Sequence, residues 1–196
     1  YNSALKEVRT KVEILNDEFQ QVHQYNPIEY IKSRIKTPES IVKKLKRYGY
    51  ESSIDNMVNY VNDIAGIRIV CSFTSDIYKL AEMIGKQNDL TVISIKDYIK
   101  NPKPNGYRSY HMIIEIPVFF SDSKKPIRVE VQIRTIAMDF WASLDHQLKY
   151  KKSFVDLNGE ISGELKQCAD VIAQTDNKML EIRKRIEAQG VTVSRD

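Results

Sequence analysis

The chain has 196 residues, of which 42% are hydrophobic and 29% charged, and its formal net charge is +4. This length and composition are typical of one soluble globular domain with helical extensions, and they exclude a disordered chain or a fibrous repeat. No apolar run approaches the roughly 18 residues that span a bilayer, so we expect a cytoplasmic protein that binds no membrane.

The two ends of the chain are predicted to be long helices. Apolar residues in 1–25 recur three and four positions apart, and in 164–187 they recur every seven, at Leu165, Ile172, Met179 and Ile186. The stripes fit either helices that pack on their own domain or an oligomer interface, and both interpretations stay open. We expect an N-terminal helix over 1–26, a core domain over 27–150 and a helical extension over 151–196.

Between the ends, the pattern predicts a mixed β-sheet flanked by helices, an α+β fold. The expected elements in chain order are a helix over 38–48, a strand over 64–73, a helix over 75–87, a strand over 90–95, two hairpin strands over 107–118 and 127–134, and helices over 135–150 and 160–187. The first helix has Thr37 as its N-cap and Pro38 at its first position, and Gly49 ends it.

The two cysteines are expected to be reduced and buried. Cys71 lies in the apolar strand over 64–73, and Cys168 lies on the apolar face of the last predicted helix. Neither has a Cys or His at the spacing of a zinc site. Two buried thiols in a cytoplasmic protein are favoured over a disulfide.

One face of the predicted hairpin carries polar side chains. Alternation along a strand places Glu130, Gln132 and Arg134 on one face, and it places His111 on a face with Tyr107 and Ser109 in the neighbouring strand. An exposed sheet face with ion pairs would show the same alternation. Mixed polar chemistry on two adjacent strands favours the floor of a cleft.

Charged residues also surround the strand over 64–73. Arg68 lies inside this apolar strand and needs a partner there, and a guanidinium stacks on bases and pairs with phosphates. Asp63 precedes the strand and is compatible with a turn or cap. Together with Glu130 it could instead hold Mg²⁺, which takes one or two carboxylates plus substrate oxygens.

Positive charge is concentrated in residues 32–47. This stretch holds seven Lys or Arg against one acid, a local net charge of +6, so the remainder of the chain carries −2 of the total +4. A solvated helix face is the plain explanation, but the helix N-terminus near Ser40 also offers N–H groups to an anion. The concentration argues against nucleic acid as the main partner.

The loop over 101–106 leads into a tyrosine. Lys103 and Arg108 flank Gly106 and Tyr107, and a Tyr ring at this place could stack on a base. Asp139, early in the helix over 135–150, could accept hydrogen bonds from guanine or simply balance the helix dipole.

Four segments together resemble the synthetase domain of the RelA/SpoT family. They are SRIKTPESIVKKLKR (33–47), DIAGIR (63–68), DYIKNPKPNGYRSYH (97–111) and EVQIRT (130–135). The resemblance covers about 27–150 and implies a nucleotidyltransferase-like core, as in the small, single-domain alarmone synthetases. These enzymes make ppGpp and pppGpp by moving pyrophosphate from ATP to the 3′-hydroxyl of GDP or GTP, which releases AMP. The resemblance also implies a homotetramer.

The same resemblance implies roles for individual residues. The adenine of ATP would lie between Arg34 and Arg68, and its phosphates would meet Lys36, Ser40, Lys44 and Arg47. Asp63 and Glu130 would bind Mg²⁺, and Glu130 would also activate the acceptor hydroxyl. The acceptor would meet Lys103, Tyr107, Arg108, His111, Gln132 and Asp139, of which Asp139 stands at a guanine-reading position where related sequences can carry Asn.

A second class of function stays open, a regulatory module that binds a nucleotide or single-stranded RNA. Basic residues are interleaved with Tyr98, Tyr107 and Tyr110, an arrangement that suits stacking on unpaired bases. A catalytically inactive member of the family should lack a metal-binding acid or the stacking tyrosine. The chain has both candidate metal-binding acids and the tyrosine, which favours an enzyme.

Overall fold

The computed structural model describes residues 1–23, 25–150 and 159–189. Along these residues the elements are α1 (Asn2–His23), β1 (Ile28–Ile35), α2 (Pro38–Arg47), α3 (Ile54–Tyr60), β2 (Ala65–Cys71), α4 (Thr74–Gly85), β3 (Thr91–Asp97), β4 (Tyr110–Phe119), β5 (Lys124–Thr135), α5 (Ile136–Tyr150) and α6 (Glu160–Ala188). None of these helices has the combination of length and apolarity that crossing a bilayer requires. The expected boundary between residues 150 and 151 borders a segment outside the described residues.

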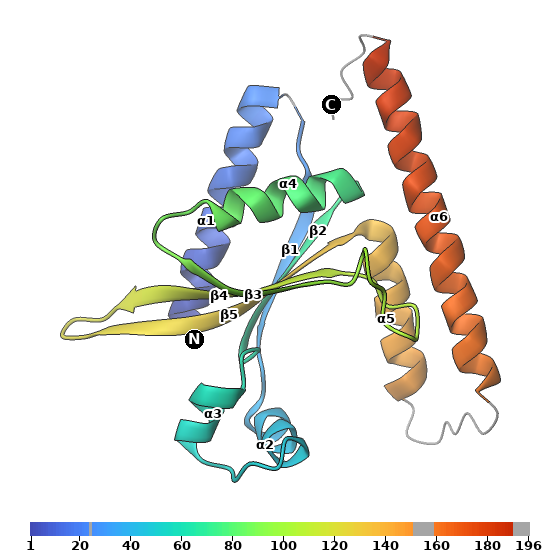
Figure 1. Cartoon of the computed structure of the whole chain (residues 1–196). Helices are drawn as coiled ribbons and strands as arrows, with labels where there is room; N and C mark the ends of the chain where they lie inside the picture. Colours follow the sequence, from blue (N-terminus) through green and yellow to red (C-terminus); the bar gives the residue numbers. More distant parts are fainter. Residues whose placement is uncertain (24, 151–158, 190–196) are drawn as a thin grey trace.

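The five strands form one mixed sheet in the order β1-β2-β5-β4-β3. Strands β2 and β5 pair in parallel, and the other neighbours pair antiparallel. Helices α1 and α4 lie over one face, α2 and α3 lie beyond the opposite face, and α5 and α6 stand side by side at one end (Figure 1). The predicted α+β fold with a mixed sheet is confirmed.

Alternate residues of the central strands form the core. Ile67, Ile69, Val131 and Ile133 are buried on the face beneath α1 and α4. The period of two therefore leaves the intervening residues of β2 and β5 on the other face, toward α2 and α3.

Helix α1 packs on its own domain. Four residues of its predicted stripe, Leu5, Val8, Val12 and Leu15, are buried in the same core as the strands. The stripe ends there, because Val22 is 67% exposed. Packing on the domain, one of the two interpretations of the stripe, is the one that the structure supports for α1.

Helix α6 is rotated relative to the orientation that its apolar stripe predicts, and Leu165 and Ile172 of the stripe are only half-buried. Its buried residues are Ala169, Asp176 and Arg183, whereas Met179 and Ile186 are exposed. Polar anchors determine this rotation: Arg183 pairs with buried Asp76, and Asp176 accepts a 2.5 Å hydrogen bond from Thr135. The same rotation exposes Cys168, so the expectation of two buried thiols is wrong for this residue and confirmed for Cys71.

Two elements were not predicted. The edge strand β1 has one strand neighbour, and five of its eight residues are exposed, so it lacks a continuous apolar signal. Helix α3 spans seven residues, none of them buried, although Ser53 caps it by accepting the Asn56 N–H. The remaining elements begin and end within about three residues of their expected positions, and Thr37 caps α2 as expected.

Candidate active site

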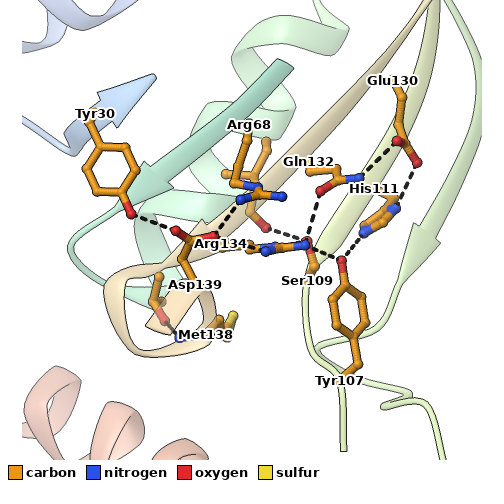
Figure 2. A network of polar contacts seen from close by, with 12 residues as sticks. Tyr30, Arg68, Tyr107, Ser109, His111, Glu130, Gln132, Arg134, Met138 and Asp139 are labelled. Carbon is orange, nitrogen blue, oxygen red and sulfur yellow. Dashed lines mark hydrogen bonds and ion pairs between the residues drawn. The ribbon is translucent and has the colours of Figure 1, made fainter. Parts of the chain in front are cut away.

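The polar face of the sheet is built by three strands. Glu130 and Gln132 alternate along β5, His111 of β4 lies opposite Gln132, and Arg68 of β2 lies beside Gln132 in the parallel register. Gly66 lies beside Glu130 and contributes no side chain, which leaves room above the strand. Strand alternation and register therefore gather the predicted polar residues on one surface (Figure 2).

Glu130 is the end point of a directed hydrogen-bond chain. A carboxylate can only accept, so the His111 ring donates from Nδ1 to Glu130 over 3.2 Å. In the neutral ring Nε2 then accepts the Tyr107 hydroxyl over 2.8 Å, and the Tyr107 oxygen accepts from Arg134 over 2.6 Å. A second branch runs from Arg134 through Gln132 to Glu130, over 3.1 and 2.9 Å.

The two acids predicted to bind metal lie in one cavity. Asp63 and Glu130 both line a cavity of about 230 Å³, together with Lys96 and Lys103. Burial alone would raise the pKa of Glu130, but the hydrogen bonds from His111 and Gln132 act against burial and the pKa is lowered; the charge of Asp63 acts in the same direction as burial. The two carboxylates are therefore close enough to influence each other.

Asp63 is held by two lysines from the basic segment. Its oxygens lie 3.0 Å from Lys36 Nζ and 2.8 Å from Lys44 Nζ. Burial would raise the pKa of the Asp63 carboxyl, and the two ammonium groups outweigh this effect and lower it. The lysines thus neutralise an acid that faces the cavity.

Three cavities adjoin along the polar face. A cavity of about 290 Å³ is lined by Arg34, Arg68 and Glu130, which also borders the cavity of Asp63. A larger cavity of about 710 Å³ shares Arg34 and Arg68 and extends over Tyr107 to α5. The shared side chains make these cavities one elongated cleft with Glu130 between its parts.

Most of the residues expected to bind a nucleotide donor lie at this cleft. Arg34 and Arg68 line two of its cavities, and Lys36 and Lys44 reach Asp63 at its edge. Ser40 and Arg47 lie exposed on α2 and line none of the three cavities.

Four of the residues expected at the acceptor also lie together. Tyr107, His111 and Gln132 belong to the hydrogen-bond chain, and Lys103 Nζ lies 4.8 Å from the centroid of the Tyr107 ring. Burial lowers the pKa of Lys103, and the positive charges of Lys96 and Arg134 lower it further.

Arg108 does not join them. Its guanidinium donates to the carbonyl oxygens of Gly106 and Ala169 and pairs with Asp170 at 2.9 Å. Arg108 belongs to the loop that precedes β4, and these contacts direct its side chain toward α6. It holds the loop against the helix rather than lining the cleft.

Asp139 also differs from its expected role. Its carboxylate is 4% exposed, and both oxygens already have partners in Arg68, Arg134 and Tyr30. A group engaged in this way does not present a free acceptor to guanine. Its place on the first turn of α5 brings it over the ends of the strands instead.

Sequence reasoning assigned no role to three residues of the site. Arg134 is recognisable in the alternating row of β5, but nothing local shows that it is the branch point of the hydrogen-bond chain. Tyr30 lies in the unpredicted strand β1. Lys96 alternates with Ser94 in β3 and with Tyr98, which follows the strand, and this period of two is a signal that could have found it.

Comparison with known proteins agrees with this arrangement. Residues 33–154 match the region found in RelA / SpoT proteins. The chain is 46% identical over 187 residues to GTP pyrophosphokinase YwaC of Bacillus subtilis (strain 168), covering 95% of this chain and 89% of the relative.

Two solved structures have the same fold. Small alarmone synthetase 1 from Bacillus subtilis bound to its product pppGpp is 33% identical, with a TM-score of 0.86 over 95% of this chain and 94% of that chain. The same synthetase bound to AMPCPP is 30% identical, with a TM-score of 0.79 over 96% and 95%. With its shared motifs, sheet and cleft, the chain belongs to the RelA/SpoT family, among relatives of the small alarmone synthetase type.

Proposed function

We propose that the protein is a (p)ppGpp synthetase that transfers pyrophosphate from ATP to the 3′-hydroxyl of GDP or GTP. The observation that carries this proposal is the position of Glu130, between the arginine-lined cavity and the cavity of Asp63, Lys96 and Lys103. A cleft with a carboxylate at its centre can hold two nucleotides whose reacting groups meet there. The names of the relatives support the same activity.

The donor nucleotide occupies the arginine side. Arg34 and Arg68 flank the adenine of ATP, where guanidinium planes can stack on the base. Lys36 and Lys44 neutralise its phosphates, and Ser40 and Arg47 extend the basic surface along α2. The solved structure of a relative with AMPCPP supports an adenine nucleotide as ligand.

The acceptor nucleotide occupies the tyrosine side. Guanine stacks on Tyr107, and Lys96 and Lys103 face its 5′-phosphates. His111 and Gln132 line this part of the cleft and hold the Glu130 carboxylate between them. The acceptor therefore presents its 3′-hydroxyl near Glu130.

The reaction breaks one P–O bond and forms another. The 3′-oxygen attacks the β-phosphorus of ATP, the bond between that phosphorus and the α,β-bridging oxygen breaks, and AMP leaves. Glu130 takes the proton of the hydroxyl. Most of the rate comes from positioning and charge neutralisation by the lysines and arginines of the cleft.

A magnesium ion fits the two acids. Asp63 and Glu130 line one cavity, and Mg²⁺ typically takes one or two carboxylates and completes its shell with water and phosphate oxygens. Asp63 and Glu130 would hold the ion, and phosphate oxygens of the substrates would supply further ligands. When bound, the ion supplies charge neutralisation at the phosphates.

A homotetramer and a cytoplasmic location complete the proposal. Along α5, Ile136, Phe140, Leu144 and Leu148 recur every four residues and are 40–57% exposed. Such a stripe on one helix face suits contact with another copy of the chain. The cytoplasm is where ATP and GTP are available together.

The decisive experiment is a product assay with Mg-ATP and GMP, GDP or GTP, analysed by chromatography. The wild-type protein is expected to form AMP and a 3′-pyrophosphorylated guanine nucleotide in equal amounts. Glu130→Gln should lower kcat by about 10²-fold or more, because the amide cannot accept the proton. Glu115→Gln is the matched control on β4, since Glu115 pairs with Arg128 outside the cleft, and it should keep wild-type activity. Unimpaired synthesis by Glu130→Gln would contradict the proposed role.

A further inference from the structure

The Asp139 carboxylate joins side chains from three strands. Its Oδ1 lies 2.9 Å from a terminal nitrogen of Arg134 and 3.2 Å from one of Arg68, and its Oδ2 accepts a 2.7 Å hydrogen bond from Tyr30 (Figure 2). Tyr30 belongs to β1, Arg68 to β2 and Arg134 to β5. One buried side chain at the start of α5 thus fixes three strands relative to one another.

This carboxylate offsets two like charges that lie close together. Burial lowers the pKa of Arg68, and the positive charge of Arg134 lowers it further. Burial would raise the pKa of Asp139, but the Tyr30 hydrogen bond and the two guanidinium groups outweigh it and lower the pKa. Loss of the negative charge would leave two neighbouring cations without compensation.

The two arginines are held to different degrees. Arg134 is 4% exposed and also donates to Ser109, Tyr107 and Gln132. The Arg68 side chain is 30% exposed, and its Nε has no hydrogen-bond partner among the described residues. The position of Arg68 therefore depends on Asp139 more strongly than that of Arg134.

The two arginines also serve different parts of the cleft. Arg68 lines the cavity with Arg34, where the donor base is assigned, and Arg134 holds the hydroxyl of Tyr107, where the acceptor base is assigned. A base that stacks on Arg68 orders this side chain against Asp139. The ordering then extends through Arg134 to Tyr107, so a second nucleotide has less freedom left to remove.

We propose that Asp139 is a positioning residue that couples the two nucleotide sites, so that each nucleotide raises the affinity for the other. This inference rests on the donor and acceptor sites proposed above. Asp139 thus links the two nucleotide sites instead of recognising the guanine base. The coupling factor is the ratio of the dissociation constants of one nucleotide in the absence and in the presence of the other. Thermodynamic reciprocity requires the same factor for both nucleotides.

Calorimetry with AMPCPP and GDP, each titrated alone and in the presence of saturating amounts of the other, measures this factor. In the wild-type protein we expect mutual tightening of about fivefold or more. In Asp139→Asn each nucleotide should still bind, but the factor should fall below about twofold. Tyr30→Phe removes one of the three contacts and should give an intermediate factor.

Asp176→Asn is the matched control. Asp176 is also a buried aspartate, and it contacts Thr135, the residue next to Arg134, without reaching the cleft. Burial raises the pKa of Asp176, so its ionised form is disfavoured in the folded protein, and the neutral amide should fold and keep the wild-type factor.

Independent binding of the two nucleotides to the wild-type protein, or an unchanged factor in Asp139→Asn, would overturn the coupling. If Asp139→Asn does not fold, an unchanged factor in Tyr30→Phe has the same consequence. Failure of both nucleotides to bind the wild-type protein would instead contradict the proposed function, so the two failures are distinguishable.

Discussion

At the scale of single residues, Tyr107 has two separable parts. Its ring lies beside two cations, with Lys103 Nζ at 4.8 Å and the Arg134 guanidinium carbon at 5.1 Å from the ring centroid. Its hydroxyl joins Arg134 to His111 and, through His111, to Glu130. We therefore expect the ring to bind the acceptor and the hydroxyl to orient the central carboxylate.

Two substitutions at this position separate the parts. Tyr107→Ala removes the stacking surface, worth about 1–3 kcal/mol per base, and should raise the acceptor KM by about tenfold or more. Tyr107→Phe keeps the ring and should lower kcat with a smaller change in KM, because the link to His111 is lost. Steady-state kinetics with GDP varied at saturating ATP measures both. Equal KM values for the two variants would contradict a stacking role.

At the scale of elements, α6 is attached to the sheet by polar anchors. Arg183 pairs with Asp76 of α4, which is fully buried, and its guanidinium carbon lies 4.1 Å from the centroid of the Tyr25 ring. Near the other end of the helix, Arg108 reaches Asp170 and the carbonyl of Ala169. The helix thus supports the loop that carries Tyr107.

Removal of the ion pair between Arg183 and Asp76 should destabilise the fold. Arg183→Ala leaves the Asp76 carboxylate buried without its cation, which costs about 3–5 kcal/mol. Urea denaturation should show this loss, whereas Lys184→Ala, at an exposed neighbouring position of α6, should change the free energy of unfolding by less than about 0.5 kcal/mol. Similar free energies of unfolding for the two variants would contradict the role of Arg183 in attaching α6.

The loop itself contacts α6 through a glycine. Gly106 has φ +88°, and a Cβ placed there would lie 2.6 Å from the Cβ of Ala169. Gly106→Ala should therefore displace the loop and raise the acceptor KM, with little effect on the KM for ATP. Adding Ala169→Gly removes the closest contact, but the 3.3 Å contact with Lys166 Cα and the backbone strain of about 1–2 kcal/mol stay, so the double variant should recover only part of the affinity. If the double variant recovered none of the acceptor affinity, the contact between position 106 and Ala169 would not be the cause of the loss.

At the scale of the whole molecule, α5 has one buried face and one exposed apolar face. Met138 and Trp141 are buried against the domain, while Phe140, Leu144 and Leu148 form the exposed stripe. The buried face positions Asp139 above the strands. We expect the exposed face to contact another copy of the chain in the proposed tetramer.

Phe140→Asp tests this assembly. A carboxylate at a residue that is 57% exposed in the single chain is tolerated by the fold, but its burial between copies carries a large desolvation cost. Light scattering coupled to size-exclusion chromatography should show a tetramer for the wild-type protein and smaller species for the variant. Ile93→Asp on β3, at a similarly exposed residue, should stay tetrameric. A variant that keeps the wild-type mass would place the interface elsewhere.

The local patterns of the sequence determined much of this protein. The period of two in β5 placed Glu130 and Gln132 on one face, and the capping residues placed the start of α2, because both depend on neighbours a few positions away. These signals, together with the four motifs, were sufficient to predict a mixed sheet with four of its five strands, most helices and the residues around Glu130.

Only the tertiary structure decided the roles of Asp139 and Arg108 and the rotation of α6. The partner of Arg108 lies 62 positions away in the sequence, and Tyr30 lies 109 positions from Asp139. Such pairings depend on how distant elements pack, and no local period encodes them. The apolar stripe of α6 predicted the orientation of this helix only in part for the same reason, because buried ion pairs and hydrogen bonds from other elements determined its rotation against the domain.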